Sequence, residues 1–335
     1  MFTKAIQIIP SIIVISTLTA CGGGGGGDGG TPTPTEPPLP IATFDGNNRV
    51  SKIEHDYDNN DVTDAITVIS YSNDAKKVTS TYTYIGDGTP DKFIKGSDAP
   101  NTVSEAIFSD EGKQLSLSMQ ETKTSGATST IKFSYAYNED DTLQKLTTEV
   151  NGNAFVYNVN YINGVMSSLT TSDVGQPQIT LAYETDGTLK VLDINNSGIS
   201  SGRSDYVWRA DGQLATINTQ YEVPVPDSSY VLQYTDAGVI VSATQTSGQY
   251  PTNEDLNLTE IYSWNGNLLT GISWDPLSTG SVVSKQTITW EDGDCYNIYA
   301  LSLGGAGGYT PPFFTRSESA VFVPGVFSLN PICSL

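Results

Sequence analysis

The acidic run from residue 56 to residue 61 is the first place where residue types and spacing could support chemistry. Asp56, Asp58 and Asn60 offer side-chain oxygens at alternate positions, as the start of a calcium-binding loop does. A calcium loop has glycine at the sixth position and a bidentate acid at the twelfth, where this chain has Asp61 and Thr67. We therefore predict no metal and no cofactor. A calcium loop of Asp56, Asp58, Asn60 and Asp61 is the alternative to a solvated acidic turn.

Nucleophilic catalysis finds little support in the sequence. His55 is the single histidine, so a triad or a multi-histidine zinc site would depend on it alone. Ser200 has the Gly-x-Ser-x-Gly spacing of a nucleophile elbow, but polar residues precede it and an expected strand follows, where an elbow needs a strand and then a helix. We predict a Ser/Gly turn at 198–202 and a protein that is not an enzyme. With 37 acidic residues, a carboxylate-dependent hydrolase stays as a third hypothesis.

Composition indicates the kind of fold that would have to position these groups. Glycine and proline together number 32 + 17 = 49 of 335 residues, and charged residues are 16%. Abundant turn formers and few charges favour an all-β chain over a helical one. The formal net charge is 16 − 37 = −21, which would repel nucleic acid, so we predict no nucleic-acid partner.

An aromatic residue recurs along the chain with a fixed pattern after it. A turn former stands four residues later, a branched aliphatic six later and another apolar residue nine later, as in Tyr183, Gly187, Leu189 and Leu192. The residue two before the aromatic is usually apolar, which is the alternation of a half-buried strand. Each unit therefore predicts a strand, a tight turn and a strand. The aromatics predicted to form the core of the repeats are Phe44, Tyr137, Tyr161, Tyr183, Trp208, Tyr234, Trp264 and Trp290.

Three of these units resemble a known repeat. Residues 135–143, 181–189 and 206–214 look like the YD repeats of Rhs-type proteins, whose pattern is roughly Tyr-x-Tyr-Asp-x-x-Gly-Arg-Leu. The resemblance spans residues 44 to about 300. In that family many such hairpins spiral into a large β shell that encloses a toxin. Here the Asp is replaced, by Arg209 for example, and about ten units are too few for a complete shell. The resemblance therefore implies the hairpin fold.

We predict one all-β domain over residues 41–335. Its repeated hairpins, at 41–303, form an antiparallel meander that either curls into an open sheet or shell or closes as a wide barrel, with a β-propeller as the alternative. Residues 304–335 turn rich in glycine and proline before an apolar strand. We predict that they form a C-terminal cap over the edge of the sheet.

The N-terminus predicts a lipid anchor. Residues 1–20 combine a positive start, a short apolar stretch and small residues, as a secretory signal does. The Leu-Thr-Ala-Cys at 18–21 resembles the lipobox of bacterial lipoproteins, which implies that Cys21 becomes the acylated first residue of the mature protein. In that family an Asp after the cysteine favours the inner membrane, so Gly22 implies the outer membrane. Residues 21–40 are the lipidated cysteine and a Gly/Pro-rich linker.

Two further cysteines, Cys295 and Cys333, lie in the C-terminal region. In the oxidising periplasm, two leftover thiols of one exported chain generally pair. We therefore predict a disulfide between Cys295 and Cys333, with a buried pair of free thiols as the alternative.

These inferences combine into a functional hypothesis. We predict a non-catalytic envelope lipoprotein, anchored in the outer membrane and facing the periplasm or the cell surface, that presents its β-repeat surface to a protein or a glycan. The alternative is a carrier or assembly factor that shelters an apolar ligand inside the curled sheet. A packed, solvated or hollow concave face would distinguish these two hypotheses.

Overall fold

The structure analysed is a computed structural model. It describes residues 48–85, 101–301 and 327–330, apart from short gaps, and the described residues form strands and turns without any helix. The gaps are at 124, 174–175, 186, 197–198, 211, 222–226, 237, 248–257, 267, 277–279, 281, 283 and 297.

The order of the elements is a succession of strands. They are β1 (Asn48–Asp56), β2 (Ala65–Tyr71), β3 (Lys77–Tyr84), β4 (Asn101–Phe108), β5 (Gln114–Thr122), β6 (Thr128–Tyr137), β7 (Leu143–Val150), β8 (Asn153–Ile162), β9 (Val165–Thr170), β10 (Pro177–Tyr183), β11 (Leu189–Asn196), β12 (Ile199–Trp208), β13 (Leu214–Tyr221), β14 (Ser228–Tyr234), β15 (Ile240–Ser247), β16 (Leu258–Asn265), β17 (Leu268–Pro276), β18 (Ser284–Asp292), β19 (Ile298–Leu301) and β20 (Phe327–Asn330).

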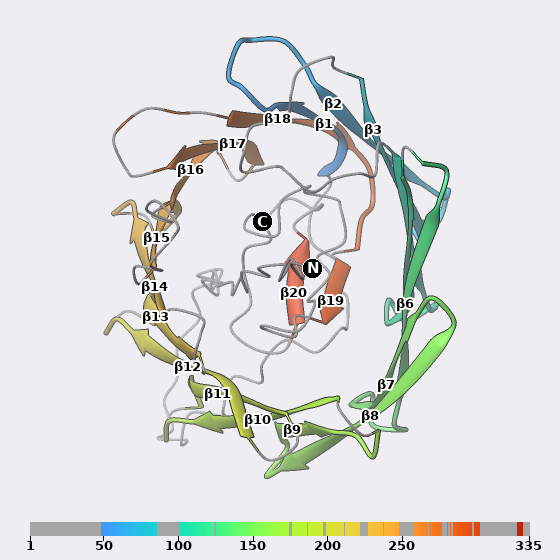
Figure 1. The fold of residues 1–335 in the computed structure, drawn as a ribbon, viewed down its shortest axis with the longest axis vertical. Helices are drawn as coiled ribbons and strands as arrows, with labels where there is room; N and C mark the ends of the chain where they lie inside the picture. Colours follow the sequence, from blue (N-terminus) through green and yellow to red (C-terminus); the bar gives the residue numbers. More distant parts are fainter. Residues whose placement is uncertain are drawn as a thin grey trace, which may run out of the picture.

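The first 18 strands form one closed antiparallel barrel, seen as a ring in Figure 1. Each strand pairs with the next one in the chain, and β18 pairs with β1 from Asn48↔Asp292 to Asp56↔Lys285. The predicted wide barrel is therefore confirmed, whereas the open sheet and the propeller are not observed. Because β1 and β18 pair with each other, this sheet leaves no edge for a cap to cover.

Alternation of apolar and polar residues sets the two faces of the wall. In β10, Ile179 and Leu181 are buried on the inside, while Gln178 and Thr180 are exposed on the outside. Most of the inward apolar side chains around the ring form one cluster, and Tyr57, Ala65 and Tyr82 form a small second one. The wall is thus apolar inside and largely hydroxyl- and amide-bearing outside.

The same tight turn follows most of the even-numbered strands. After Tyr183, for instance, the Glu184 amide donates to the Thr188 carbonyl and the Gly187 amide donates to the Glu184 carbonyl. The position four after the aromatic has a left-handed backbone, which glycine adopts without steric cost. Two non-glycine residues also adopt it here, Ala75 with φ 57° and Asp141 with φ 69°. The end of the barrel that carries these turns is called the turn rim below, and the opposite end the loop rim.

An Asn-Gly turn closes the β8–β9 hairpin as a two-residue loop. Asn163 and Gly164, between β8 and β9, have φ values of 55° and 79°, as a type I′ turn requires and as their spacing predicts. At the β16–β17 hairpin, by contrast, Asn265 belongs to β16 and pairs with Leu268, so Asn265 and Gly266 are not the two central residues of a turn.

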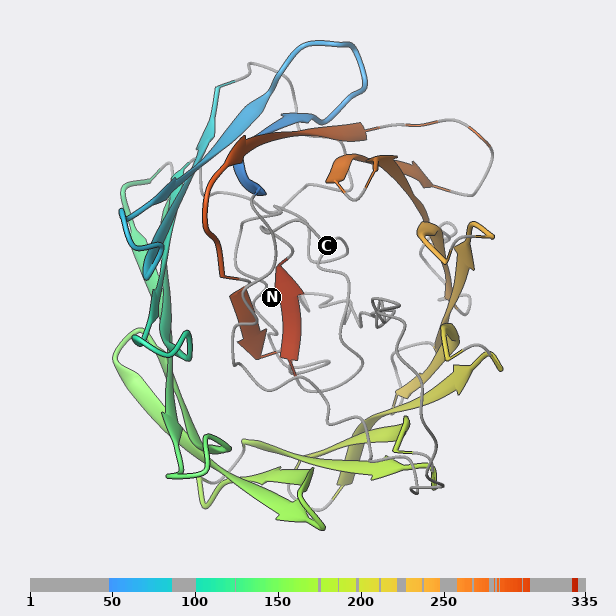
Figure 2. The same cartoon turned by 180° about the vertical axis from the view of Figure 1, so that it is seen from behind.

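After β18 the chain turns into the ring (Figures 1 and 2). Cys295 and Ile298 are fully buried and belong to the apolar cluster, and the Tyr296 ring stacks on Phe108 with centroids 5.1 Å apart. β19 contacts β5 and pairs with β20, the part of the predicted cap that lies within the described residues. The described part of the C-terminal region therefore contributes to the interior of the barrel.

Candidate functional site

The repeat aromatics share one hydrogen bond that their spacing alone did not predict. Each lies half-buried at the turn rim, packs on the apolar cluster and donates to a backbone carbonyl at the start of the preceding odd-numbered strand. Phe44 lies outside the described residues. The pairs are Tyr71 to Val50 (2.8 Å), Tyr137 to Gln114 (2.8 Å), Tyr161 to Leu143 (3.0 Å), Tyr183 to Met166 (2.8 Å), Trp208 to Leu189 (2.7 Å), Tyr234 to Leu214 (2.9 Å), Trp264 to Ile240 (2.8 Å) and Trp290 to Leu269 (2.8 Å).

We call this repeated contact the aromatic clamp. The carbonyl that accepts it belongs to the residue six after the previous aromatic, or five where the turn is shorter, so each clamp joins one unit to the unit before it. This residue is apolar at every clamp except that of Tyr137, where it is Gln114. The signal in the sequence was the residue type. Tyr and Trp carry both an apolar ring and a polar donor, whereas Phe108, at the same repeat position, has no donor. The aromatics thus have a structural role in addition to core packing.

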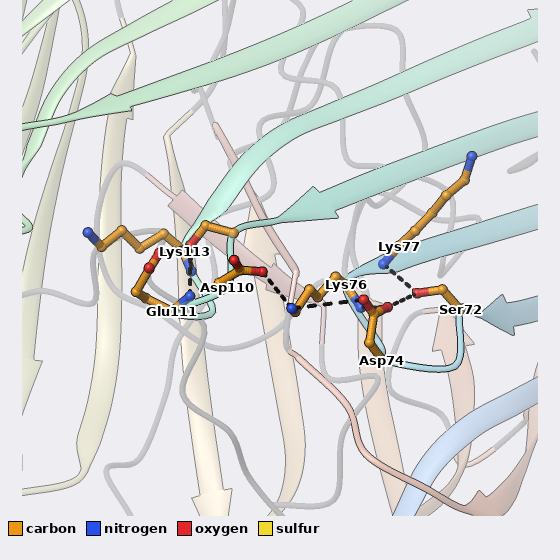
Figure 3. A network of polar contacts seen from close by, with 8 residues as sticks. Ser72, Asp74, Lys76, Lys77, Asp110, Glu111 and Lys113 are labelled. Carbon is orange, nitrogen blue, oxygen red and sulfur yellow. Dashed lines mark hydrogen bonds and ion pairs between the residues drawn. The ribbon is translucent and has the colours of Figure 1, made fainter.

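Side chains also join neighbouring turns along the turn rim. Lys76 forms an ion pair with Asp110 of the next turn at 2.6 Å, and Lys113 pairs with Asp141 of the turn after that (Figure 3 shows the first two turns). Further round the ring, the Gln213 amide donates to the Gly238 carbonyl at 3.0 Å. These exposed contacts are individually weak, and they follow the same unit-to-unit order as the clamps.

The predicted calcium residues lie at the loop rim, where β1 ends. Asp56 is buried, and its carboxylate accepts hydrogen bonds from the backbone amides of Asn60 (3.1 Å) and Asp61 (2.8 Å). Lys285 of β18 lies 3.4 Å from that carboxylate and also pairs with Asp61. Its hydrogen bond lowers the pKa of Asp61. These ion pairs therefore connect the loop to β18, the strand that closes the barrel by pairing with β1.

Asp64 is a member of this acidic group that sequence reasoning missed. Asp56, Asp58 and Asp64 can each place one carboxylate oxygen within 4.8 Å of the others. One Asp64 oxygen, however, accepts the backbone amide of Tyr57 at 2.7 Å, and Asp58 accepts the Asn60 side-chain amide at 2.9 Å. Carboxylates could hold a hard cation in such an arrangement, but these already have protein donors. The calcium loop therefore stays the alternative to the predicted metal-free acidic turn.

His55 lies inside the wall beside two tyrosines. Its Nε2 is 2.9 Å from the Thr67 hydroxyl, and its ring contacts Tyr57 and Tyr82, whose hydroxyls are 3.0 Å apart. Complete burial lowers the pKa of His55 to about 3, because the imidazolium would lose its hydration. The imidazole is therefore neutral near pH 7 and is too weak a base for general base catalysis there.

A second buried titratable group lies on the inner face of β16. The Glu260 carboxylate accepts the Tyr262 hydroxyl at 2.5 Å and the Trp274 indole N–H at 3.1 Å. Burial, followed by the charge of Glu260, raises the pKa of Tyr262 well above its usual value. The arrangement holds a carboxylate in place by two donors, which is a structural use of a buried acid.

The other predicted site residues divide between described and undescribed positions. Cys295 is fully buried, whereas Cys21 and Cys333 lie outside the described residues. The turn predicted around Ser200 was wrong, since β12 begins at Ile199 and runs as a strand to Trp208. The paired strand β11 favours the extended backbone there.

One part of the outer wall stands out for its lack of charge. On β12 to β16, each outward position alternates with a buried or half-buried inward one, and we call this surface the β12–β16 outer face. Arg203 and Asp205 are its charged residues and pair with each other at 2.9 Å. The outward residues are Arg203, Asp205, Val207, Thr216, Asn218, Gln220, Ser229, Val231, Gln233, Ser242, Thr244, Thr246, Thr259, Ile261 and Ser263.

A row of uncharged side chains crosses this face perpendicular to the strands. Val207 pairs with Thr216, Thr216 with Val231, Val231 with Thr244, and Thr244 with Thr259. Val207 and Val231 are 48% and 43% exposed. The face thus presents methyl groups and hydroxyls side by side.

Comparison with known proteins identifies no family. No protein-family model matches the chain, and no curated protein matches it. Among solved structures, TcdB2-TccC3 without its hypervariable C-terminal region is 16% identical, with a TM-score of 0.32 over 71% of this chain and 12% of that one. A porin-like protein from Bacteroides uniformis is 10% identical, with a TM-score of 0.39 over 72% of this chain and 98% of that one. The described residues include no helix that could span a membrane.

Proposed function

We propose that this protein is a non-catalytic envelope lipoprotein that binds a neutral glycan or an uncharged protein surface through its β12–β16 outer face. The observation that carries the proposal is the uncharged row from Val207 to Thr259 in a chain whose net charge is −21. Strong acidity keeps most of such a surface solvated and repels acidic partners, so an uncharged, half-apolar face is where a neutral partner loses least hydration on binding.

The chemistry of the face suits hydroxyl-bearing partners. Its amides and hydroxyls already bond to one another, as in Ser229 to Asn218 at 2.9 Å and Ser242 to Gln233 at 3.2 Å. Such pairs hold donors and acceptors in fixed directions, and the valines between them offer apolar contact. A sugar ring has both kinds of surface.

The inner wall supports surface binding over the carrier hypothesis. Its apolar side chains, such as Leu169 and Ile217, have no exposed surface, so they are packed rather than lining a hollow. Attachment through Cys21 and the linker at 21–40 stays part of the proposal, as does the outer-membrane location, and both rest on the sequence.

Binding is tested with one charge placed in the face and a matched charge placed elsewhere. Val231→Glu puts a carboxylate into the row, and Val103→Glu does the same on the outer wall of β4, where the valine is equally exposed, at 45%. We expect Val231→Glu to weaken binding about tenfold and Val103→Glu to leave it within about twofold. The measurements are cosedimentation of the mature protein with insoluble envelope polysaccharide, and crosslinking to solubilised envelope proteins. Equal binding by the two variants, or no binding in either assay, would reject the proposal.

A further inference from the structure

The inner wall of the barrel is buried where none of the described elements covers it. Six aliphatic side chains on β7, β9, β10 and β13 have no exposed surface, although they face the inside of the ring. These residues are Leu143, Leu146, Leu169, Ile179, Leu214 and Ile217. The strand pair inside the ring, β19 with β20, contacts β5.

The wall side chains are too short to cover one another across the ring. With strands about 4.8 Å apart and tilted by about 40°, an 18-stranded barrel is on the order of 35 Å across. Barrels of this size leave a lumen. Complete burial of an apolar inner wall therefore requires more chain inside it.

One segment has both of its ends in the right place. Residues 302–326 leave β19 at Leu301 and return to β20 at Phe327, and these two residues pair with each other inside the ring. The segment has 326 − 301 = 25 residues. A path out and back gives about 12 residues each way, or about 40 Å when extended, which is enough to cross the lumen.

The composition of this segment fits an apolar wall. It carries one cation, Arg316, and one acid, Glu318, among Tyr309, Phe313, Phe314 and several valines, alanines and glycines. The β3–β4 connection at 86–100 contains five charged residues in 15. Burying charges inside the lumen would cost far more than burying aromatics.

We propose that residues 302–326 occupy the lumen as the chain's own core, packed against the apolar inner wall of β7 to β13. The apolar inner wall is then covered by the chain itself, and the binding surfaces are on the outside. This inference does not depend on the identity of any external partner.

Trypsin tests the proposal in the wild-type protein. Arg316 is the single Lys or Arg after Lys285, so cleavage there releases residues 317–335 once any disulfide is reduced. We expect cleavage after Arg316 in the native protein to be at least about 100-fold slower than in urea-unfolded protein, because the bond must first leave the lumen. Cleavage at similar rates in the native and unfolded protein would overturn the proposal.

Hydrogen exchange measured by mass spectrometry identifies the occupant independently. We expect amides of 302–326 to be protected in the full wild-type chain. Protection of residues 1–47 or 86–100 with free exchange in 302–326 would assign the lumen to another segment and overturn the proposal. A double variant, Phe313→Ser with Phe314→Ser, should increase binding of a hydrophobic dye several-fold, whereas Ser317→Ala should leave it unchanged.

Discussion

The indole Nε1 of Trp208 donates a hydrogen bond of 2.7 Å to the backbone carbonyl oxygen of Leu189, the first residue of β11. The same hydrogen bond recurs from Tyr71 to Trp290. Each clamp therefore joins two neighbouring units both by this hydrogen bond and by the packing of the aromatic ring. Removing the donor and keeping the ring separates the two contributions.

Replacing a clamp tyrosine with phenylalanine should destabilise the barrel. In Tyr183→Phe the Met166 carbonyl loses its donor at a half-buried position, and we expect unfolding to become easier by about 1 kcal/mol. Urea denaturation measures the change. Thr79→Val, on the outer face of β3, is the control and should shift stability by no more than about 0.5 kcal/mol. If Tyr183→Phe matches the control, the clamp contributes no net stability.

Ala75→Gly should change stability little, because relief of the left-handed backbone strain offsets the loss of a buried methyl group. Ala75 has φ 57° at the turn position where other units have glycine, and an alanine there is strained by about 1 kcal/mol. The reverse change, Gly212→Ala, should cost about 1 kcal/mol, because its φ is 83° and no atom lies within 4 Å of an added Cβ. Thermal unfolding of both variants measures the two shifts. A loss of stability in Ala75→Gly as large as that in Gly212→Ala would contradict this interpretation of the turn.

Stability should fall as the pH is lowered through the range in which His55 titrates in the unfolded chain. The pKa of His55 is about 3 in the folded protein and about 6.5 when unfolded, so the unfolded state binds a proton that the native state does not. The free energy of unfolding therefore rises with pH between these values, by at most about 1.4 kcal/mol per pH unit.

The variant His55→Gln isolates this effect. Its pH dependence should be flatter than that of the wild type between about pH 4.5 and 6.5, above the range where most carboxyl groups titrate. Denaturant unfolding at several pH values gives the difference. Parallel curves for the two proteins would show that His55 is not buried as a neutral imidazole.

Cys295 and Cys333 should be disulfide-bonded. The paired residues of β19 and β20 sum to 298 + 330 = 628, and 295 + 333 gives the same sum. If the antiparallel register continued for three more residues, it would bring the two cysteines opposite each other. Closing a loop of about 38 residues should contribute about 3 to 4 kcal/mol. Peptide mapping without reduction should find the linked peptides, and alkylation of both thiols in unreduced protein would refute the pairing.

Cys21→Ser should abolish membrane attachment. The thiol is the atom that the lipobox resemblance assigns to acylation, and serine cannot accept that thioether. The variant should stay unprocessed or be released from membrane fractions, as immunoblotting of fractionated cells would show. A mature variant that still sediments with membranes would exclude lipidation at this residue. Ser11→Ala, within the signal, is the control and should be processed normally.

The local parts of this fold were predictable because their causes lie close together in the sequence. Tyr183, Gly187 and Leu189 define a strand end, a left-handed turn and a strand start within seven residues. Closure of the ring was left open among alternatives, because it depends on the curvature summed over 18 strands and on the pairing of Asn48 with Asp292.

The candidate sites were less predictable for the same reason. Lys285, which pairs with Asp56 and Asp61, is 224 positions from Asp61, so the spacing of residues within the loop does not predict it. The groups that accept the clamp hydrogen bonds are backbone carbonyls, which every residue has, so the residue types in the sequence do not mark them. The β12–β16 outer face emerges only when the register places Val207, Thr216 and Val231 side by side.

Pairing of β1 with β18 has a consequence for how the chain folds. All other pairings of the barrel join strands that follow one another in the chain, so each needs only a short loop to close, and hairpins can form one after another. The pairing of β1 with β18 is the exception, because it joins the two ends of the sheet. Until Asn48–Asp56 meets Ser284–Asp292, a nearly complete sheet exposes two unpaired edges. The species most prone to aggregate is therefore the late, almost finished sheet, and conditions that hasten closure should raise the yield of soluble protein.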